Sequence, residues 1–197
     1  MNNTEHVVDI FTQNARAASS TVVTAGSLRE AVDYAVRLCA DNAGIPPSVP
    51  GGEEGRDILA APDMPADLWP HLVEAGKAKG VRVIDKNVRE HPNGVCVGFS
   101  VGDMGIANTG TVILRCYKED TRLASMLAET HVIALPASTI VATSYDAEDF
   151  LQQAMAGPMY TAFISGCSRT SDIERVLTLG VHGPLSLHII LIQEGQA

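Results

Sequence analysis

The first part of the chain carries hydrophobic residues at helical spacing. In residues 5–18 apolar side chains recur every three to four positions, which predicts a peripheral amphipathic helix. Further along, Ser27 and Glu30 stand in the order of a capping box, in which the two side chains bond free backbone amides at a helix start. An apolar stripe then continues to Gly44. It predicts a second helix of about four turns.

Beyond a loop rich in proline and glycine at residues 46–55, short β-rich runs alternate with helical patterns. The runs that predict strands are 58–61, 81–85, 95–99, 111–115, 132–135, 160–164 and 187–192. The runs that predict helices are 69–79, 122–128, 147–156 and 171–179. Such alternation is typical of an α/β fold, so we expect an open, mostly parallel sheet with flanking helices.

The composition agrees with this fold class. The chain has 197 residues, of which 46% are hydrophobic, 5% aromatic and 19% charged. Its core must therefore consist mainly of Val, Ile, Leu and Ala, the residues of a parallel sheet that is buried on both faces. The length suits one domain better than two, so we expect residues 1–197 to form a single domain.

The charge and hydropathy of the chain argue against two classes of partner, nucleic acids and membranes. The formal net charge of -9 repels nucleic-acid phosphates, and Asp85 interrupts the basic cluster at 82–89, so we expect no nucleic-acid partner. No run approaches the roughly 18 apolar residues of a membrane span. The first residues also lack the basic and apolar regions of a secretory signal. We therefore expect no membrane span and a cytoplasmic location.

Four cysteines, Cys39, Cys96, Cys116 and Cys167, are spread along the chain without a C-x-x-C pair. Zinc and iron–sulfur sites usually draw at least two ligands from nearby positions. We therefore expect no metal and no cofactor bound by this chain alone, and reduced thiols that pack as small apolar groups. Cys167 differs because it lies beside Arg169, where a reactive thiol is the alternative interpretation.

A first candidate binding stretch is the glycine-rich segment 102–111, which precedes a predicted strand. Its residues Asn108, Thr109, Gly110 and Thr111 could present amides and hydroxyls to an anion. The segment is neither a Walker loop nor a dinucleotide fingerprint. A tight turn without a binding role is the alternative interpretation.

A second candidate stretch, 165–174, follows an apolar strand pattern. Ser171 and Glu174 match a capping box there, and Asp172 lies in the positive first turn of the predicted helix. Five residues of the stretch are not explained by that cap, and they are Ser165, Gly166, Ser168, Arg169 and Thr170. A helix start with a neighbouring guanidinium suits a phosphate or a carboxylate, so these five residues are candidate ligand-binding residues.

The turn 180–184 supplies a histidine outside any regular element. His182 could donate to a ligand oxygen or transfer a proton, and Asp172 is the other candidate for proton transfer. Alternatively, His182 only shapes the turn. Gly183 beside it joins the ligand-binding set, whereas His188 within a strand is interpreted as structural.

These stretches are far apart in sequence, but the ends of strands in a doubly wound sheet bring distant loops together. We therefore predict that Ser168, Arg169, Thr170, the turn 109–111 and His182 converge on one pocket for a small anion.

Four stretches taken together resemble the LUD domain family. They are I-A-N-T-G-T at 106–111, P-A-S at 136–138, S-G-C-S-R-T-S-D-I-E at 165–174 and G-V-H-G-P at 180–184. The resemblance covers residues 81–197, whereas residues 1–50, a helical region and loop, match only in helical character. Two positions depart from the family pattern, because Asn108 stands where relatives often have an acidic residue and Cys167 where proline is common.

The resemblance implies a fold similar to the sugar-phosphate isomerase and coenzyme A transferase superfamily. In the LUD family, lactate-utilisation proteins work beside iron–sulfur partners in oxidising L-lactate to pyruvate. The resemblance therefore implies a ligand-binding or assembly subunit with a small carboxylate or phosphate ligand and with iron–sulfur clusters on partner proteins.

A competing interpretation is a stand-alone isomerase, transferase or ligase that acts on a phosphosugar, a coenzyme A thioester or a folate-like ligand. In that case His182 or Asp172 would transfer protons, and Arg169 would neutralise an anion. A third interpretation, which the Asn108 departure permits, is a regulatory protein without activity.

Overall fold

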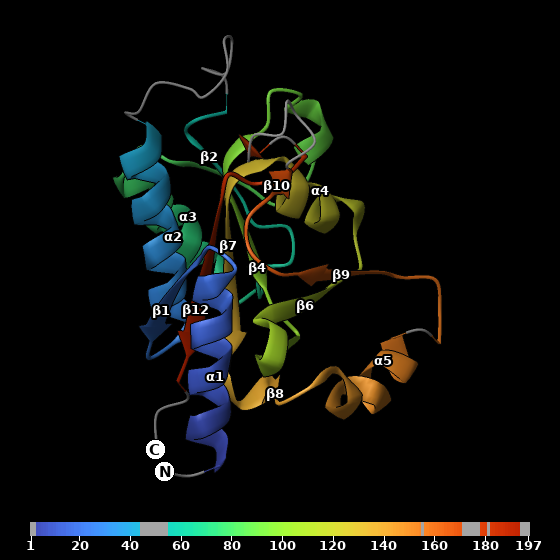
Figure 1. Cartoon of the computed structure of the whole chain (residues 1–197). Helices are drawn as coiled ribbons and strands as arrows, with labels where there is room; N and C mark the ends of the chain where they lie inside the picture. The colour runs from blue at the N-terminus through green and yellow to red at the C-terminus, as the bar shows by residue number, and fades with distance from the viewer. Residues whose placement is uncertain (1–2, 44–54, 155, 171–177, 181, 194–197) are drawn as a thin grey trace.

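A parallel sheet of six strands forms the centre of the computed structural model, which describes residues 3–43, 55–154, 156–170, 178–180 and 182–193. Its order is β1-β12-β7-β4-β2-β3, and every neighbouring pair is parallel (Figure 1). The strands in that order are Ser20–Ala25, Ser186–Ile192, Ala128–Pro136, Val95–Val101, Ile58–Ala60 and Arg82–Ile84. The predicted α/β class and parallel sheet are confirmed.

A second, four-stranded sheet has the order β8-β5-β6-β9, with the strands Ile140–Val141, Met104–Ile106, Thr111–Cys116 and Tyr160–Ile164. Only the β5 and β8 pair is parallel here, whereas β6 runs antiparallel to both β5 and β9. The sequence did not predict this sheet, because β5 and β8 are only three and two residues long.

A short antiparallel pair joins β10, Arg169–Thr170, to β11, Thr178–Leu179. The predicted helix 171–179 is wrong at this end, since Thr178 and Leu179 form a strand. They pair with Thr170 and Arg169, and the next amide, that of Gly180, donates to the Ser168 carbonyl at 3.0 Å. The rest of that prediction, with the Ser171 and Glu174 cap, falls on 171–177, outside the described residues.

The main helices lie on both faces of the central sheet or against the second sheet. They are α1 Asn3–Ala17, α2 Leu28–Ala43, α3 Trp69–Ala78, α4 Glu119–Leu127 and α5 Glu148–Ala154. Short 3-10 turns are η1 Val88–Glu90, η2 Ala107–Thr109, η3 Ala137–Thr139 and η4 Ser144–Ala147. Figure 1 shows α2 and α3 on one side of the central sheet, with α1 and the second sheet on the other.

The alternation of side chains along β7 explains why this strand is apolar throughout. Val132 and Ala134 pack into the core beneath α2 and α3, whereas Ile133 and Leu135 pack toward α1 and the second sheet. All four are fully buried. Each large aliphatic side chain contributes about 1.5–3 kcal/mol on burial, so both faces of the sheet stabilise the fold.

The predicted cap of α2 is present in part. The Glu30 amide donates to Ser27 Oγ at 3.2 Å, and the Glu30 carboxylate accepts from the Gly26 amide at 2.8 Å. The start of α2 is therefore stabilised by both side chains, with the carboxylate bonding one residue earlier than a capping box requires. No helix in the described part of the chain is long and apolar enough to cross a membrane.

Candidate functional site

A pocket of about 380 Å³ opens between strand β9 of the second sheet and strands β7 and β12 of the central sheet. Its walls come from β9, the loop 165–168, the turn 182–184 and the last turn of α4. Its volume lies within the roughly 300–1,000 Å³ that small-molecule sites usually enclose. The pocket lies over the amino-terminal half of β12, where Leu187 is the second residue, rather than beyond the carboxyl ends of the central strands.

The floor of the pocket contains a histidine that the sequence analysis did not single out. His131 on β7 lies in register between Gly98 of β4 and Leu187 of β12, and its side chain faces the second sheet, as Ile133 does. Ser100 lies on the same face of β4, and its Oγ is 3.0 Å from His131 Nε2. Both residues are buried, at 1% and 3% exposure. His131 follows Glu129 and Thr130 just before the apolar run 132–135, so its position in the sequence gave no signal of a binding role.

Burial determines the charge of this histidine. It lowers the pKa of His131 from its ordinary value to about 3. The ring is therefore neutral near pH 7 and carries one donor and one acceptor nitrogen. His131 can bond a hydroxyl or a carbonyl but cannot neutralise an anion.

A chain of hydroxyls links the predicted turn 109–111 to the pocket. Thr109 Oγ1 is 2.7 Å from Thr111 Oγ1, which is in turn 2.7 Å from Ser165 Oγ. Ser165 lines the pocket, whereas Thr111 is buried behind it. The turn therefore supports the pocket wall through Ser165.

Two predicted glycines lie where helix α1 approaches the second sheet. A Cβ at Gly110 would overlap the backbone of Ala15, and a Cβ at Gly166 would overlap the Ala18 carbonyl. Both glycines also have positive φ angles, 61° and 80°. Side chains are disfavoured there for steric reasons. These glycines are needed for packing whether or not a ligand binds.

Ser168 joins the loop after β9 to the turn that carries His182. Its backbone amide donates to the Pro184 carbonyl at 3.0 Å, and its Oγ accepts from the His182 amide at 3.4 Å. Gly183 packs against the Ser168 side chain. This contact holds His182, which is exposed, at the wall of the pocket.

The structure brings together about half of the predicted binding residues. Ser165, Gly166, Ser168, His182 and Gly183 line the pocket, and Cys167 lines it from a buried position.

The other predicted residues do not line the pocket. Arg169 is exposed, and its guanidinium donates to Ser19 Oγ at 3.5 Å, because β10 directs the chain away along the pairing with β11. Thr170 is a member of that same strand pair, and the backbone amide of Asn108 donates to the Ala142 carbonyl at 3.0 Å. Asp172 lies outside the described residues.

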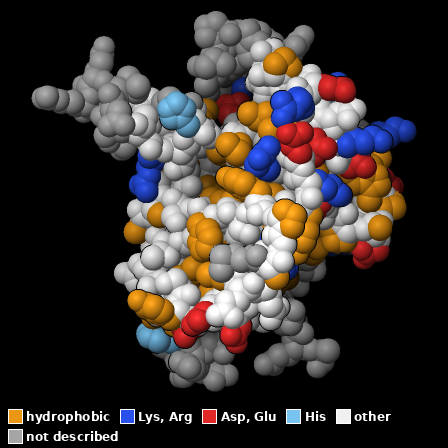
Figure 2. Space-filling model, turned by 90° about the vertical axis from the view of Figure 1, so that its right-hand side faces the viewer, with side chains coloured by type: hydrophobic (Ala, Val, Ile, Leu, Met, Phe, Trp, Pro, Cys, Tyr) orange, Lys and Arg blue, Asp and Glu red, His pale blue; other side chains and the backbone are white. Residues whose placement is uncertain are grey.

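Exposed apolar side chains surround the opening. Tyr160, Phe163 and Met126 are 47%, 54% and 46% exposed, and all three line the pocket. The guanidinium of Arg122 lies 5.4 Å from the centre of the Tyr160 ring, which places a cation beside the opening. Figure 2 shows the face on the right of Figure 1, with hydrophobic side chains across its middle and charged side chains above them.

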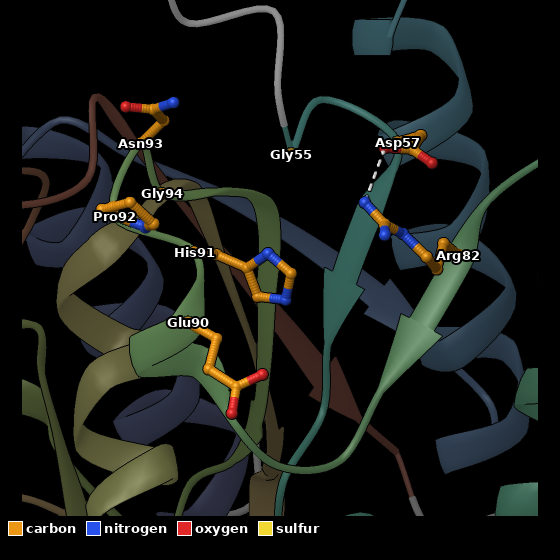
Figure 3. A pocket seen from close by; sticks show the side chains of 8 residues that line it. All are labelled: Gly55, Asp57, Arg82, Glu90, His91, Pro92, Asn93 and Gly94. Atoms are coloured by element: carbon orange, nitrogen blue, oxygen red, sulfur yellow. Dashed lines mark ion pairs between the residues drawn. The ribbon is translucent and has the colours of Figure 1, made fainter.

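A second hollow of about 280 Å³ lies at the amino ends of β2, β3 and β4 (Figure 3). On one side Asp57 pairs with Arg82 at 3.5 Å, and on the other lie Glu90 and His91. None of the predicted binding residues lines it. Its two carboxylates outnumber its one guanidinium, and Asp57 is paired with that guanidinium, so it offers no net positive charge for an anion.

The cysteines are buried free thiols. A hydrogen bond to Cys96, together with burial, raises the pKa of Cys39, and burial raises the pKa of Cys116 to about 11. A raised pKa disfavours the thiolate that metals and clusters require. Within the described residues, no group of three or more His, Cys, Asp or Glu side chains is arranged to hold a metal ion.

Comparisons with known proteins agree with this architecture. A sequence model of the LUD domain matches residues 8–192. The chain is 32% identical over 193 residues to lactate utilization protein C of Bacillus subtilis, covering 96% of this chain and 76% of that protein. It is 31% identical to lactate utilization protein C of Bacillus licheniformis over 138 residues, covering 65% of this chain and 55% of that protein.

A solved structure extends the comparison to the fold. The crystal structure of a DUF162 family protein from Deinococcus radiodurans matches with a TM-score of 0.62 at 15% identity. The match covers 98% of this chain and 100% of that one. Because the LUD sequence model and the Bacillus subtilis relative cover nearly the whole chain, the chain belongs to the LUD domain family.

Proposed function

We propose that this protein serves lactate utilisation by binding a small monocarboxylate, such as lactate or pyruvate, in the pocket between β9 and the central sheet. In this proposal the chain is a ligand-binding or assembly subunit, and partner proteins with iron–sulfur clusters carry the electrons. The names of the relatives support the first part of the proposal. The iron–sulfur partners are carried over from the family resemblance.

The charge of the pocket is the observation that favours a monocarboxylate. None of the described residues that line it is Lys, Arg, Asp or Glu. A phosphosugar or a coenzyme A diphosphate carries two or more negative charges, and their burial without cations is costly. A single carboxylate needs fewer hydrogen-bond donors and less positive charge. These can come from His182, from Arg122 at the rim and from the hydroxyls of Ser165 and Ser168.

The two ends of such a ligand fit two parts of the pocket. The open end carries the exposed His182 and the neighbouring Arg122, where a carboxylate keeps part of its water. The inner part contains Ile164, Leu187 and the neutral His131, which suit a methyl group and one hydroxyl or carbonyl oxygen. This arrangement follows from desolvation, because a carboxylate loses more hydration free energy on burial than a methyl or a hydroxyl group does.

Calorimetric titration with L-lactate, pyruvate and inorganic phosphate tests the proposal. Ala162 on β9 lines the pocket, and Ala162→Phe should fill it and abolish carboxylate binding. Ala142 is exposed and does not line the pocket, so Ala142→Phe adds the same side chain elsewhere and should bind as the wild type does. Binding of neither carboxylate, or tighter binding of phosphate than of both, would reject the monocarboxylate proposal.

A further inference from the structure

Within the described part of the chain, the ring of His131 makes one hydrogen bond, between Nε2 and Ser100 Oγ, at 3.0 Å. The ring is 99% buried, given its 1% exposure, and it borders the pocket. A buried polar atom without a partner costs free energy, so native proteins rarely leave one unpaired. The second ring nitrogen, Nδ1, is therefore available for a ligand atom or an ordered water.

We propose that His131 determines ligand specificity by hydrogen bonding, through Nδ1, the oxygen on the second carbon of a 2-hydroxy or 2-oxo acid. This inference rests on the proposed function and adds the residue that distinguishes such acids from simple fatty acids. Ser100 acts as a positioning residue, because its bond to Nε2 fixes the orientation and the tautomer of the ring.

The neutral state of the ring suits this role. A protonated histidine on the floor would draw the carboxylate inward, whereas a neutral ring gives the innermost position to an uncharged oxygen. Gly98 and Leu187 pair with His131 in the sheet, so the ring has a small neighbour on one side and an aliphatic neighbour on the other. A ligand without the oxygen would leave Nδ1 facing a methylene group.

The expected discrimination follows from that mismatch. A site that bonds a substrate hydroxyl rejects an analogue that lacks it, because the polar atom of the site is left unpaired in the complex. L-lactate and propionate differ only in the 2-hydroxyl. Wild-type protein should bind L-lactate at least about tenfold more tightly than propionate.

Two substitutions separate the two nitrogens of the ring. The amide of asparagine falls near the position of Nδ1, so His131→Asn keeps the contact with the ligand and loses the bond to Ser100. The amide of glutamine falls near Nε2, so His131→Gln keeps the bond to Ser100 and loses the contact with the ligand. The lactate preference should persist in His131→Asn and disappear in His131→Gln, with propionate affinity nearly unchanged in both.

Calorimetry with L-lactate and propionate, with melting curves for every variant, measures this pattern. A purely structural His131 predicts the opposite, with the preference retained in His131→Gln and the stability loss concentrated in His131→Asn. Equal affinity of the wild type for the two acids overturns the specificity inference alone. Absence of binding for both acids overturns the proposed function as well.

A measurement on the wild type covers the case in which both variants fail to fold. Histidine ring nitrogens labelled with ¹⁵N report protonation and hydrogen bonding directly. L-lactate should shift the His131 Nδ1 resonance, and propionate at equal saturation should leave it in place. A shift of equal size with both acids, or with neither, would reject the contact.

Discussion

At the scale of single residues, the polar side chains of the pocket are held in place in different ways. Ser165 and Ser168 join backbone segments, through Thr111 and through the turn 182–184, and still present their side chains to the pocket. His131 instead sits in the apolar sheet and is neutral because of burial. Ser165 and Ser168 were predictable because they belong to a stretch rich in serine and threonine that follows a predicted strand. His131 was not, because its partner Ser100 is on another strand.

Buried His131 should make the protein sensitive to mild acid. Burial lowers its pKa to about 3, whereas an unfolded chain has the ordinary value near 6.5, so the unfolded state binds more protons between these values. The contribution of His131 is complete above about pH 6.5 and is lost as pH falls toward about 3. Between about pH 7 and about pH 5, this loss should lower the free energy of unfolding by up to about 2 kcal/mol.

Urea unfolding of the wild type and His131→Gln across that pH range measures the effect. The variant should show a smaller loss of unfolding free energy by about that amount, while carboxylates remain ionised in both proteins. If the free energies of unfolding of the two proteins change with pH in parallel, the His131 ring becomes protonated in the folded protein as readily as in the unfolded chain.

At the scale of elements, helix α1 supports the site although none of its residues lines the pocket. Its end contacts the loops at Gly110 and Gly166, and Asn14 Nδ2 donates to the Ala107 carbonyl at 2.8 Å. The motif turn 108–111 is thus explained largely by packing. The sequence could not distinguish packing from binding, because glycines with positive φ serve both.

Substitution of these glycines should separate backbone strain from steric overlap. Gly80 has a positive φ of 70° with no atom near its added Cβ, so Gly80→Ala should cost about 1–2 kcal/mol from strain alone. Gly166→Ala adds overlap with the Ala18 carbonyl and should cost at least about 1–3 kcal/mol more. Chemical denaturation compares the two variants. An equal loss in both would mean that α1 does not approach the loop as described.

The chain of hydroxyls behind the pocket, formed by Thr109, Thr111 and Ser165, should also contribute to stability. Thr111→Val removes the central hydroxyl and leaves Thr109 and Ser165 without that partner, so it should cost about 1–3 kcal/mol. Thr21→Val, at an exposed position on the edge strand β1, is the control and should change stability by at most about 0.5 kcal/mol. Denaturation curves for both variants test the comparison. Similar small losses of stability in both would mean that water takes over the hydrogen bonds of the missing hydroxyl.

The central parallel sheet was largely predictable at the element scale, and the second sheet was not. Strands such as β7 and β12 read as continuous apolar runs because both faces are buried. Strand β1 was missed because its threonines face outward at the edge of the sheet. The second sheet depends on pairing of β6 with β9, which are separated by more than forty residues, and no local pattern reveals such pairing.

At the scale of the whole molecule, the two sheets enclose the pocket, and buried thiols are distributed among separate elements. Cys39 lies on α2, Cys96 on β4, Cys116 on β6 and Cys167 after β9. A hydrogen bond to Cys96 together with burial favours the thiol form of Cys39, and burial favours the thiol form of Cys116. The pocket between the sheets has a size that suits a small ligand.

Protein purified without partners should be colourless and should contain no stoichiometric iron. Incubation with iron and sulfide under reducing conditions should not build a cluster, because assembly requires several thiolates at one point. Iron analysis and visible absorption measure the result. A stable chromophore with about four irons per chain would contradict the subunit role, since this chain could then carry electrons itself.

In the proposed function, a small monocarboxylate occupies the pocket between β9 and the central sheet. Backbone amide NMR during titration with L-lactate tests it most directly, because each perturbed residue reports its own position. We expect saturable shifts at five residues of the pocket, namely Ser165, Gly166, Ser168, His182 and Gly183, and no shifts at Asn93 and Gly94 in the hollow of Figure 3. Shifts confined to that hollow, or no saturable shifts at any residue, would contradict it.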